Sequence, residues 1–93
     1  MIVAKVVGTV WATQKQQSLT GHRLLVVQPL DADEQPTGNL IVAIDALGAG
    51  MGQQVLVALG SSAQRGTTQG ESPIDAAVVA LVDKLEVDKR HLG

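Results

Sequence analysis

Two clusters of small residues bracket a short apolar run in the second half of the chain. Glycines stand at positions 48, 50 and 52, residues 55–59 (VLVAL) follow, and residues 60–63 (GSSA) come next. Glycine permits tight turns and close backbone approach. Valine favours the pleated strand because its branched side chain is stiff. The pattern therefore predicts a short strand between two tight loops, which favours a fold of short strands over one of long helices.

The composition predicts a small aliphatic core. Val, Leu and Ile supply 28 of the 93 residues, whereas Phe, Tyr and Cys are absent and Trp11 is the only aromatic residue. A chain of this length makes one domain with a modest core, and without cysteine it has neither disulfides nor thiolate sites. We expect a single domain over residues 1–93, with a frayed tail at residues 88–93.

The charge pattern argues against two classes of partner. The formal net charge is −2, and charges of both signs are interspersed. The sequence therefore lacks a basic tract of the kind that binds nucleic acid or an anionic membrane. No apolar stretch approaches the roughly 18–20 residues that span a bilayer, and the start of the chain lacks a secretory signal pattern. We therefore expect a soluble intracellular protein.

Apolar runs separated by turn residues predict the strands. Beyond the polar segment 60–72, residues 72–75 (SPID) have the form of a helix start. The periodicity of residues 78–87 fits either a helix or a strand. We predict one helical turn from Pro73 to Ala77 and then a fifth strand to about Val87. The four earlier strands are predicted at residues 2–13, 23–30, 39–45 and 53–59.

Five short strands with one short helix are typical of a small, partly open β-barrel of the OB-like type. Gly8 lies inside the first predicted strand and indicates a bulge or sharp bend of the kind that closes a barrel. The glycine cluster at positions 48–52 predicts a turn that depends on Gly50. The fold class is therefore predicted as mainly β.

Isolated polar residues do not form a catalytic or metal site in this sequence. His22 and His91 are the only histidines, and a solvated surface position is the simpler expectation for each. Asp31 and Asp33 resemble the start of a calcium loop, but the required glycine at the sixth position is missing, so a turn is favoured. We expect no bound metal.

The small-residue loops also lack the context that cofactor or nucleophile chemistry needs. The glycines at 48, 50 and 52 precede a strand, whereas a phosphate-binding loop precedes a helix N-terminus. Ser61 and Ser62 have no nearby base. We therefore expect no cofactor and no catalytic residues, which predicts a protein that is not an enzyme.

Three further residues are candidates for contacts between proteins. Arg65 lies in a polar loop, where a guanidinium can bridge to a neighbouring subunit; the alternative is an arginine that is simply solvated. Lys15 stands among glutamines and is a weaker candidate of the same kind. Trp11 near the end of the first predicted strand indicates core or interface packing.

Several short segments, in this order and at this spacing, resemble the vertex proteins of bacterial microcompartment shells, the EutN/CcmL type. The resemblance extends from about residue 2 to residue 87. Two positions depart from it, because Gln64 separates Ala63 from Arg65 and Gln53 stands where an acid is common. The segments are residues 8–13 (GTVWAT) with Lys15, 24–30 (LLVVQPL), 43–50 (AIDALGAG), 55–57 (VLV), 60–63 (GSSA) with Arg65, and 73–79 (PIDAAVV).

The resemblance implies a structural protein that forms a cyclic homopentamer and caps the fivefold vertices of a microcompartment shell in the bacterial cytoplasm. The implied partners are hexameric shell proteins, with no nucleic acid and no membrane. The alternative is a small β-barrel module that binds a metabolite or nucleic acid. The candidate interface charges are Lys15 and Arg65, and the candidate residues at the ring axis or the subunit interface are Gly48, Ala49, Gly50, Gly52, Gly60, Ser61, Ser62 and Ala63.

Overall fold

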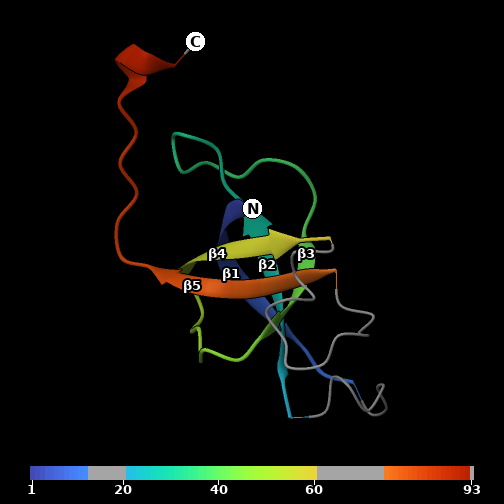
Figure 1. Cartoon of the computed structure of the whole chain (residues 1–93). Helices are drawn as coiled ribbons and strands as arrows, with labels where there is room; N and C mark the ends of the chain where they lie inside the picture. The colour runs from blue at the N-terminus through green and yellow to red at the C-terminus, as the bar shows by residue number, and fades with distance from the viewer. Residues whose placement is uncertain (13–20, 61–74, 93) are drawn as a thin grey trace.

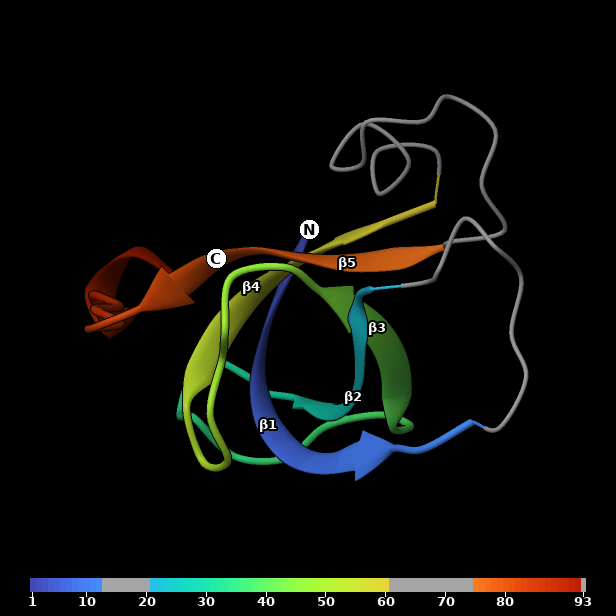
Figure 2. The same cartoon turned by 90° about the horizontal axis from the view of Figure 1, so that it is seen from below.

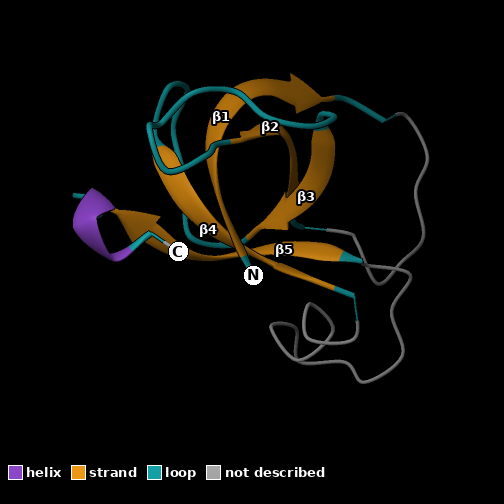
Figure 3. Ribbon diagram, turned by 90° about the horizontal axis from the view of Figure 1, so that it is seen from above, coloured by secondary structure: helices purple, strands orange, loops and turns teal. Residues whose placement is uncertain are grey.

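The computed structural model describes residues 1–12, 21–60 and 75–92, and over these it is a five-stranded barrel (Figure 1). The strands close in the order β1-β2-β3-β5-β4, as the view along the barrel shows (Figure 3). Their bounds are Ile2–Val10 for β1, Arg23–Pro29 for β2, Ile41–Asp45 for β3, Gln54–Leu59 for β4 and Ala76–Val82 for β5. The mainly-β prediction is confirmed.

One parallel contact closes the barrel. Strands β3 and β5 pair in parallel with Ile44 opposite Ala77, whereas every other neighbouring pair is antiparallel. The prediction of a partly open barrel is therefore wrong, because this crossover pair joins the two ends of the sheet. Beyond this single pair, β3 and β5 form no further ladder pairs with each other.

Strand β1 curls around the barrel and pairs with both β2 and β4 (Figure 2). Its register against β2 shifts between Val6 and Gly8, which confirms the predicted bulge. A Cβ atom on Gly8 would lie 3.4 Å from the Cβ of Val26 on the facing strand. That distance is ordinary van der Waals contact, so the approach of the two strands at the bend does not depend on the missing side chain.

The interior is filled by small and medium aliphatic side chains, as the composition predicts. Alternate residues of each strand point inward, so the core draws on every strand of the barrel. A second, smaller cluster of Ile44 and Ala77, with Leu24 against it, lies across three neighbouring strands. The main cluster comprises Ala4, Val6, Leu25, Val27, Ala43, Ala49, Val55, Val57, Ala76 and Val78.

The predicted helical turn at residues 73–77 is wrong where the structure describes it. Ala76 and Ala77 are the first residues of β5 and lie opposite Leu59 and Ala58 of β4. Pairing with β4 thus overrides the local helix-start signal. The rest of that predicted turn, Pro73 included, lies outside the described residues.

The fifth strand is confirmed but ends at Val82 rather than at about Val87. Its partner β4 begins at Gln54, which lies opposite Val82, so no residue of β4 remains to pair with the chain beyond. Strand β1 likewise ends at Val10, before the predicted end at residue 13. Within residues 1–12, 21–60 and 75–92, no helix has the length and apolarity to cross a membrane.

The chain leaves the barrel after β5 and ends in a short 3-10 helix, Lys89–His91. Asp88 caps this turn, because its Oδ1 accepts a hydrogen bond from the backbone N–H of Arg90 at 3.0 Å. Lys89 forms an ion pair with Asp33 in the turn that follows β2. The expected frayed tail at residues 88–93 stays a prediction.

Candidate functional site

A buried carboxylate at the end of β3 organises the glycine-rich loop that joins β3 to β4. The Asp45 side chain has no exposed surface, and its Oδ1 and Oδ2 accept hydrogen bonds from the backbone N–H groups of Leu47 and Ala49, each at 2.9 Å. Arg23, opposite Asp45 on β2, donates from Nη1 to the Ala49 carbonyl at 2.9 Å. The same Nη1 lies 3.7 Å from Asp45 Oδ2. These contacts fix the first half of the loop to the barrel.

The sequence predictions do not include this anchor. Asp45 stands at the end of a predicted strand and directly before a glycine-rich turn, and a carboxylate at such a position often accepts hydrogen bonds from the following backbone. That local signal was available for the turn. The pairing of Asp45 with Arg23 has no such local signal, because only the β2–β3 register brings the two residues together.

Two of the three glycines in the loop carry backbone conformations that suit glycine. Gly48 and Gly52 both have φ of 82°, in the left-handed region. Gly50 has no such φ, and a Cβ built on it meets no atom within 4 Å. The expectation that the turn depends on Gly50 is therefore wrong, and the dependence lies with its two neighbouring glycines. The predicted turn itself is confirmed.

The second half of the loop is fastened to β1. The N–H of Gly52 donates to the Val6 carbonyl at 2.8 Å, and the N–H of Val6 donates to the Gln53 carbonyl at 2.9 Å. Gln53 Oε1 also accepts from the N–H of Gly50 at 3.1 Å. Ala49 packs in the main core cluster. A position for this loop at a ring axis or subunit interface stays a prediction.

The second candidate loop is described only at its ends. Gly60 has φ of 64°, and its N–H donates to the carbonyl of Asp75 at 2.8 Å, so the two ends of the segment between them meet beside β4 and β5. The other candidates on this loop and on the first polar loop lie outside the described residues. These are Ser61, Ser62, Ala63 and Arg65, together with Lys15.

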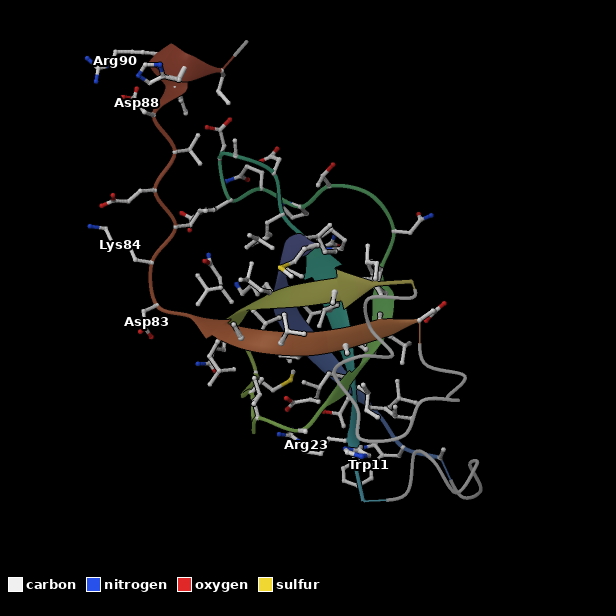
Figure 4. The ribbon with its side chains drawn as sticks, viewed as in Figure 1. Trp11, Arg23, Asp83, Lys84, Asp88 and Arg90 are labelled. Atoms are coloured by element: carbon white, nitrogen blue, oxygen red, sulfur yellow. The ribbon has the colours of Figure 1, made fainter. Side chains whose placement is uncertain are left out.

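Trp11 stands exposed at the same end of the barrel as Arg23 (Figure 4). Its surface is 91% accessible, so packing of Trp11 in the core of its own chain is excluded. Trp11 and Arg23 line one side of a pocket of about 370 Å³, together with the half-buried His22. Interface packing of Trp11 stays a prediction.

The barrel surface carries more exposed apolar side chains than the strand pattern alone predicts. One set, the β1–β3 face, surrounds β2, and the other, the β4–β5 face, lies on the two strands across the barrel from it (Figure 3). Exposed apolar side chains are candidates for contacts between proteins. The β1–β3 face comprises Val7, Leu40 and Val42, and the β4–β5 face comprises Leu59, Val79 and Leu81.

Neither acidic nor histidine side chains gather into a metal site in the described parts of the chain. No group of three or more His, Asp or Glu side chains there is placed to hold a metal ion. Asp31 Oδ1 instead accepts hydrogen bonds from the N–H groups of Asp33 and Gln35 at 2.8 and 3.0 Å, which confirms a turn at this position. His91 is exposed in the tail, where its Nε2 lies 3.7 Å from Asp88 Oδ2.

The comparisons with known proteins agree with this architecture. The family model described as "Ethanolamine utilisation protein EutN/carboxysome" matches residues 1–83. The shell vertex protein GrpN of Rhodospirillum rubrum is 48% identical over 92% of this chain and 97% of its own length. The carboxysome shell vertex protein CcmL of Synechocystis is 47% identical, over 94% of this chain and 87% of its own.

A solved structure of the first relative extends the likeness to three dimensions. The structure described as the GrpN pentameric microcompartment shell protein from Rhodospirillum rubrum superposes with a TM-score of 0.83 at 45% identity. The match covers 94% of this chain and 100% of that one. The microcompartment shell vertex protein EutN of Salmonella typhimurium is 40% identical over 91% of this chain and 86% of its own length.

Proposed function

The chain belongs to the EutN/carboxysome family, and from that premise we propose that it is a structural shell protein, a homopentamer that caps the fivefold vertices of a bacterial microcompartment in the cytoplasm. The observation that carries the proposal is the likeness, along the whole of its length, to a relative whose structure is described as pentameric. In this proposal residues 1–93 make one vertex domain, which acts through the shape of the assembly that it forms and catalyses no reaction.

The physical need for such a protein comes from geometry. A flat sheet of hexagonal tiles closes into a polyhedron only where fivefold positions interrupt it. A ring of five copies uses one contact repeated head to tail, in which two different faces of each subunit meet. The β1–β3 face and the β4–β5 face are two different sets of exposed apolar side chains on different strands of this barrel, and a head-to-tail contact requires two different surfaces.

We assign the subunit contact to these two faces, with Val42 as the residue to test. Val42 is 49% exposed and lies opposite Val26 on β2. Covering its exposed half stabilises the contact by about 1 kcal/mol, and burying an unpaired carboxylate there costs several kcal/mol. Val42→Glu should therefore raise the protein concentration at which half of the rings dissociate by at least about tenfold.

The experiment is a mass measurement of the native assembly over a range of concentrations. The unaltered protein should give a single species at five times the 9.7 kDa chain mass. Val42→Thr is the matched control, because it keeps the branched shape without adding charge, and it should stay assembled. Another stoichiometry for the unaltered protein would overturn the pentamer. A Val42→Glu ring as stable as that of the control would overturn the assigned contact.

The remaining site residues enter the proposal as parts of the ring. The candidate loops (Gly48, Ala49, Gly50 and Gly52; Gly60, Ser61, Ser62 and Ala63) lie near the axis or the subunit contact, and Lys15 and Arg65 bridge to acids of a neighbouring subunit. Arg65→Ala should then weaken the ring by a few-fold, since a bridge on the surface is worth at most about 1 kcal/mol. An unchanged dissociation concentration would remove Arg65 from the contact.

Hexameric shell proteins are the proposed partners outside the ring. Nucleic acid is not, because single-strand binding on a small barrel relies on a basic groove with stacking aromatics, and this chain has a net charge of −2 and one aromatic residue. A pull-down of the purified ring against hexameric tiles tests the partnership, with Val42→Glu as a comparison. Retention of tiles by the ring supports the proposal, and equal binding of an oligonucleotide at low salt contradicts it.

A further inference from the structure

The segment that follows the barrel has the side-chain pattern of a strand. Residues 84–88, here named the arm, run extended from the end of β5 to the 3-10 turn. Charged Lys84, Glu86 and Asp88 alternate with apolar Leu85 and Val87. Alternation of this kind is typical of a strand that buries one side.

The arm is nevertheless unpaired within its own chain. Strand β5 stops at Val82 because β4 begins at its partner Gln54. Among the residues that the structure describes, no backbone hydrogen bond from arm residues 84–87 to another segment is formed. The N–H and C=O groups of an extended segment that lack partners form a free edge, which is a template for pairing with another chain.

Apolar side chains of the arm, and the turn just beyond it, face the rest of the same chain. Leu85 and Val87 line a pocket of about 330 Å³ with Met1, Ile2 and other residues of the N-terminal end and of the turn after β2. Just beyond the arm, Lys89 forms its ion pair with Asp33. The sticks in Figure 4 show the arm standing beside the barrel on the side away from Trp11 and Arg23. One side of the arm is thus directed to its own chain, and its backbone edge is left available.

We propose that the arm adds as a β-strand to a second copy of this chain, across the subunit boundary of the ring. The inference rests on the proposed ring, which supplies a neighbouring copy beside each barrel. Strand addition draws its affinity from main-chain hydrogen bonds, with alternate side chains giving the register. The family match covers residues 1–83, so the arm lies beyond the part of the chain that this family model matches.

Charge supports a copy of the same chain as the occupant. The turn at the end of the arm carries Lys89, Arg90 and His91, whereas the turn after β2 carries Asp31, Asp33 and Glu34. Every copy in a ring presents both turns, so basic and acidic groups of neighbouring copies meet with opposite sign. The ion pair between Lys89 and Asp33 demonstrates that these two turns are complementary.

Two matched double variants test whether the backbone of the arm pairs. Glu86→Pro with Val87→Pro removes two adjacent N–H groups, which point to opposite edges of a strand, and proline keeps the segment extended. Glu86→Ala with Val87→Ala shortens the same two side chains but keeps both N–H groups. The proline variant should dissociate at a concentration at least about tenfold higher than the alanine variant, as measured by native mass.

Hydrogen exchange on the intact, unaltered protein gives the second readout. The amides of residues 85–88 should exchange at least about tenfold more slowly in the ring than in the diluted, dissociated chain. A pentamer in which these amides exchange freely, or in which they are protected only after hexameric tiles are added, would overturn pairing with a second copy. Equal stability of the proline and alanine variants would do the same, whereas a protein with no ring at all refutes the proposed function itself.

Discussion

Replacing Asp45 with alanine removes the acceptor for two backbone N–H groups of the β3–β4 loop. The Ala49 N–H is buried, so it loses its partner without gaining water, at a cost of about 1–3 kcal/mol. The Leu47 N–H is partly exposed and can turn to solvent, so its hydrogen bond is worth about 1 kcal/mol. Arg23 is half exposed and keeps the Ala49 carbonyl, so its contact adds little. The expected loss is about 2–4 kcal/mol.

That loss is a large share of the stability of so small a domain, which is of order 5–10 kcal/mol. The assay is urea unfolding followed by far-ultraviolet circular dichroism, with every variant at the same protein concentration because assembly adds to apparent stability. A slope near 1–2 kcal/mol per molar urea converts the loss to a midpoint lowered by about 1–4 M. The exposed Asp83→Ala serves as the control and should leave the midpoint unchanged.

An Asp45→Ala midpoint within about 0.3 M of the control would refute the reasoning. It would mean that the loop keeps its shape without the carboxylate, or that water replaces it beside Ala49. Asp45→Asn separates these effects, because one amide oxygen can still accept from one of the two N–H groups. Its midpoint should fall between those of Asp45→Ala and the unaltered protein.

Three further outcomes follow from the described contacts. Gly48→Ala should destabilise the chain by about 1 kcal/mol in the same urea assay because of its positive φ, whereas Gly50→Ala should be neutral or slightly stabilising; equal effects would contradict the assignment. The side chain and N–H of Arg90 lower the pKa of Asp88, so the cap is present above the ordinary carboxyl pKa and is lost as the pH falls through the lowered value. The carboxyl chemical shift of Asp88 on acidification should titrate below the ordinary pKa range of an aspartate, and a titration within that ordinary range would exclude the cap. Trp11 is the only tryptophan, so its fluorescence should move to shorter wavelength when rings assemble from diluted chains, and an unchanged spectrum would leave Trp11 outside the contact.

The strands were predictable because their signals are local. Alternating Val and Leu between turn residues place β2, β3 and β4 to within two residues at each end, and Gly8 marks the bulge. The predicted strand bounds are wrong where pairing with another strand determines the structure. Ala76 and Ala77 are in a strand because β4 lies opposite them, and β5 ends at Val82 because β4 does not extend further. A helix-start pattern and an alternating tail contain no information about the length of another strand.

The candidate site was less predictable for the same reason. The small-residue loop was identified, but the pairing of Arg23 with the Asp45 anchor depends on a register that connects residues 22 positions apart. The exposed Val7 and Val42 have the same sequence pattern as buried valines, since the outward positions of these strands are also apolar. Only the closed barrel separates the two groups, by turning one row inward and leaving the other on the surface.

Closure of the barrel also determines how copies can associate. With β3 joined to β5, the sheet is closed, and in the proposed ring two barrels meet through their side-chain faces. Face-to-face packing of rigid, well-packed surfaces fixes an angle between neighbours, and a fixed angle is what a ring of defined number needs. The arm differs, because backbone pairing by an extended segment adds affinity without requiring a particular angle between barrels. If both proposals hold, charged substitutions on the faces should weaken the ring and can also change its number of copies, whereas substitutions in the arm should change only the concentration at which the same ring forms. A change of stoichiometry in the proline variant of the arm would show that this division of roles is wrong.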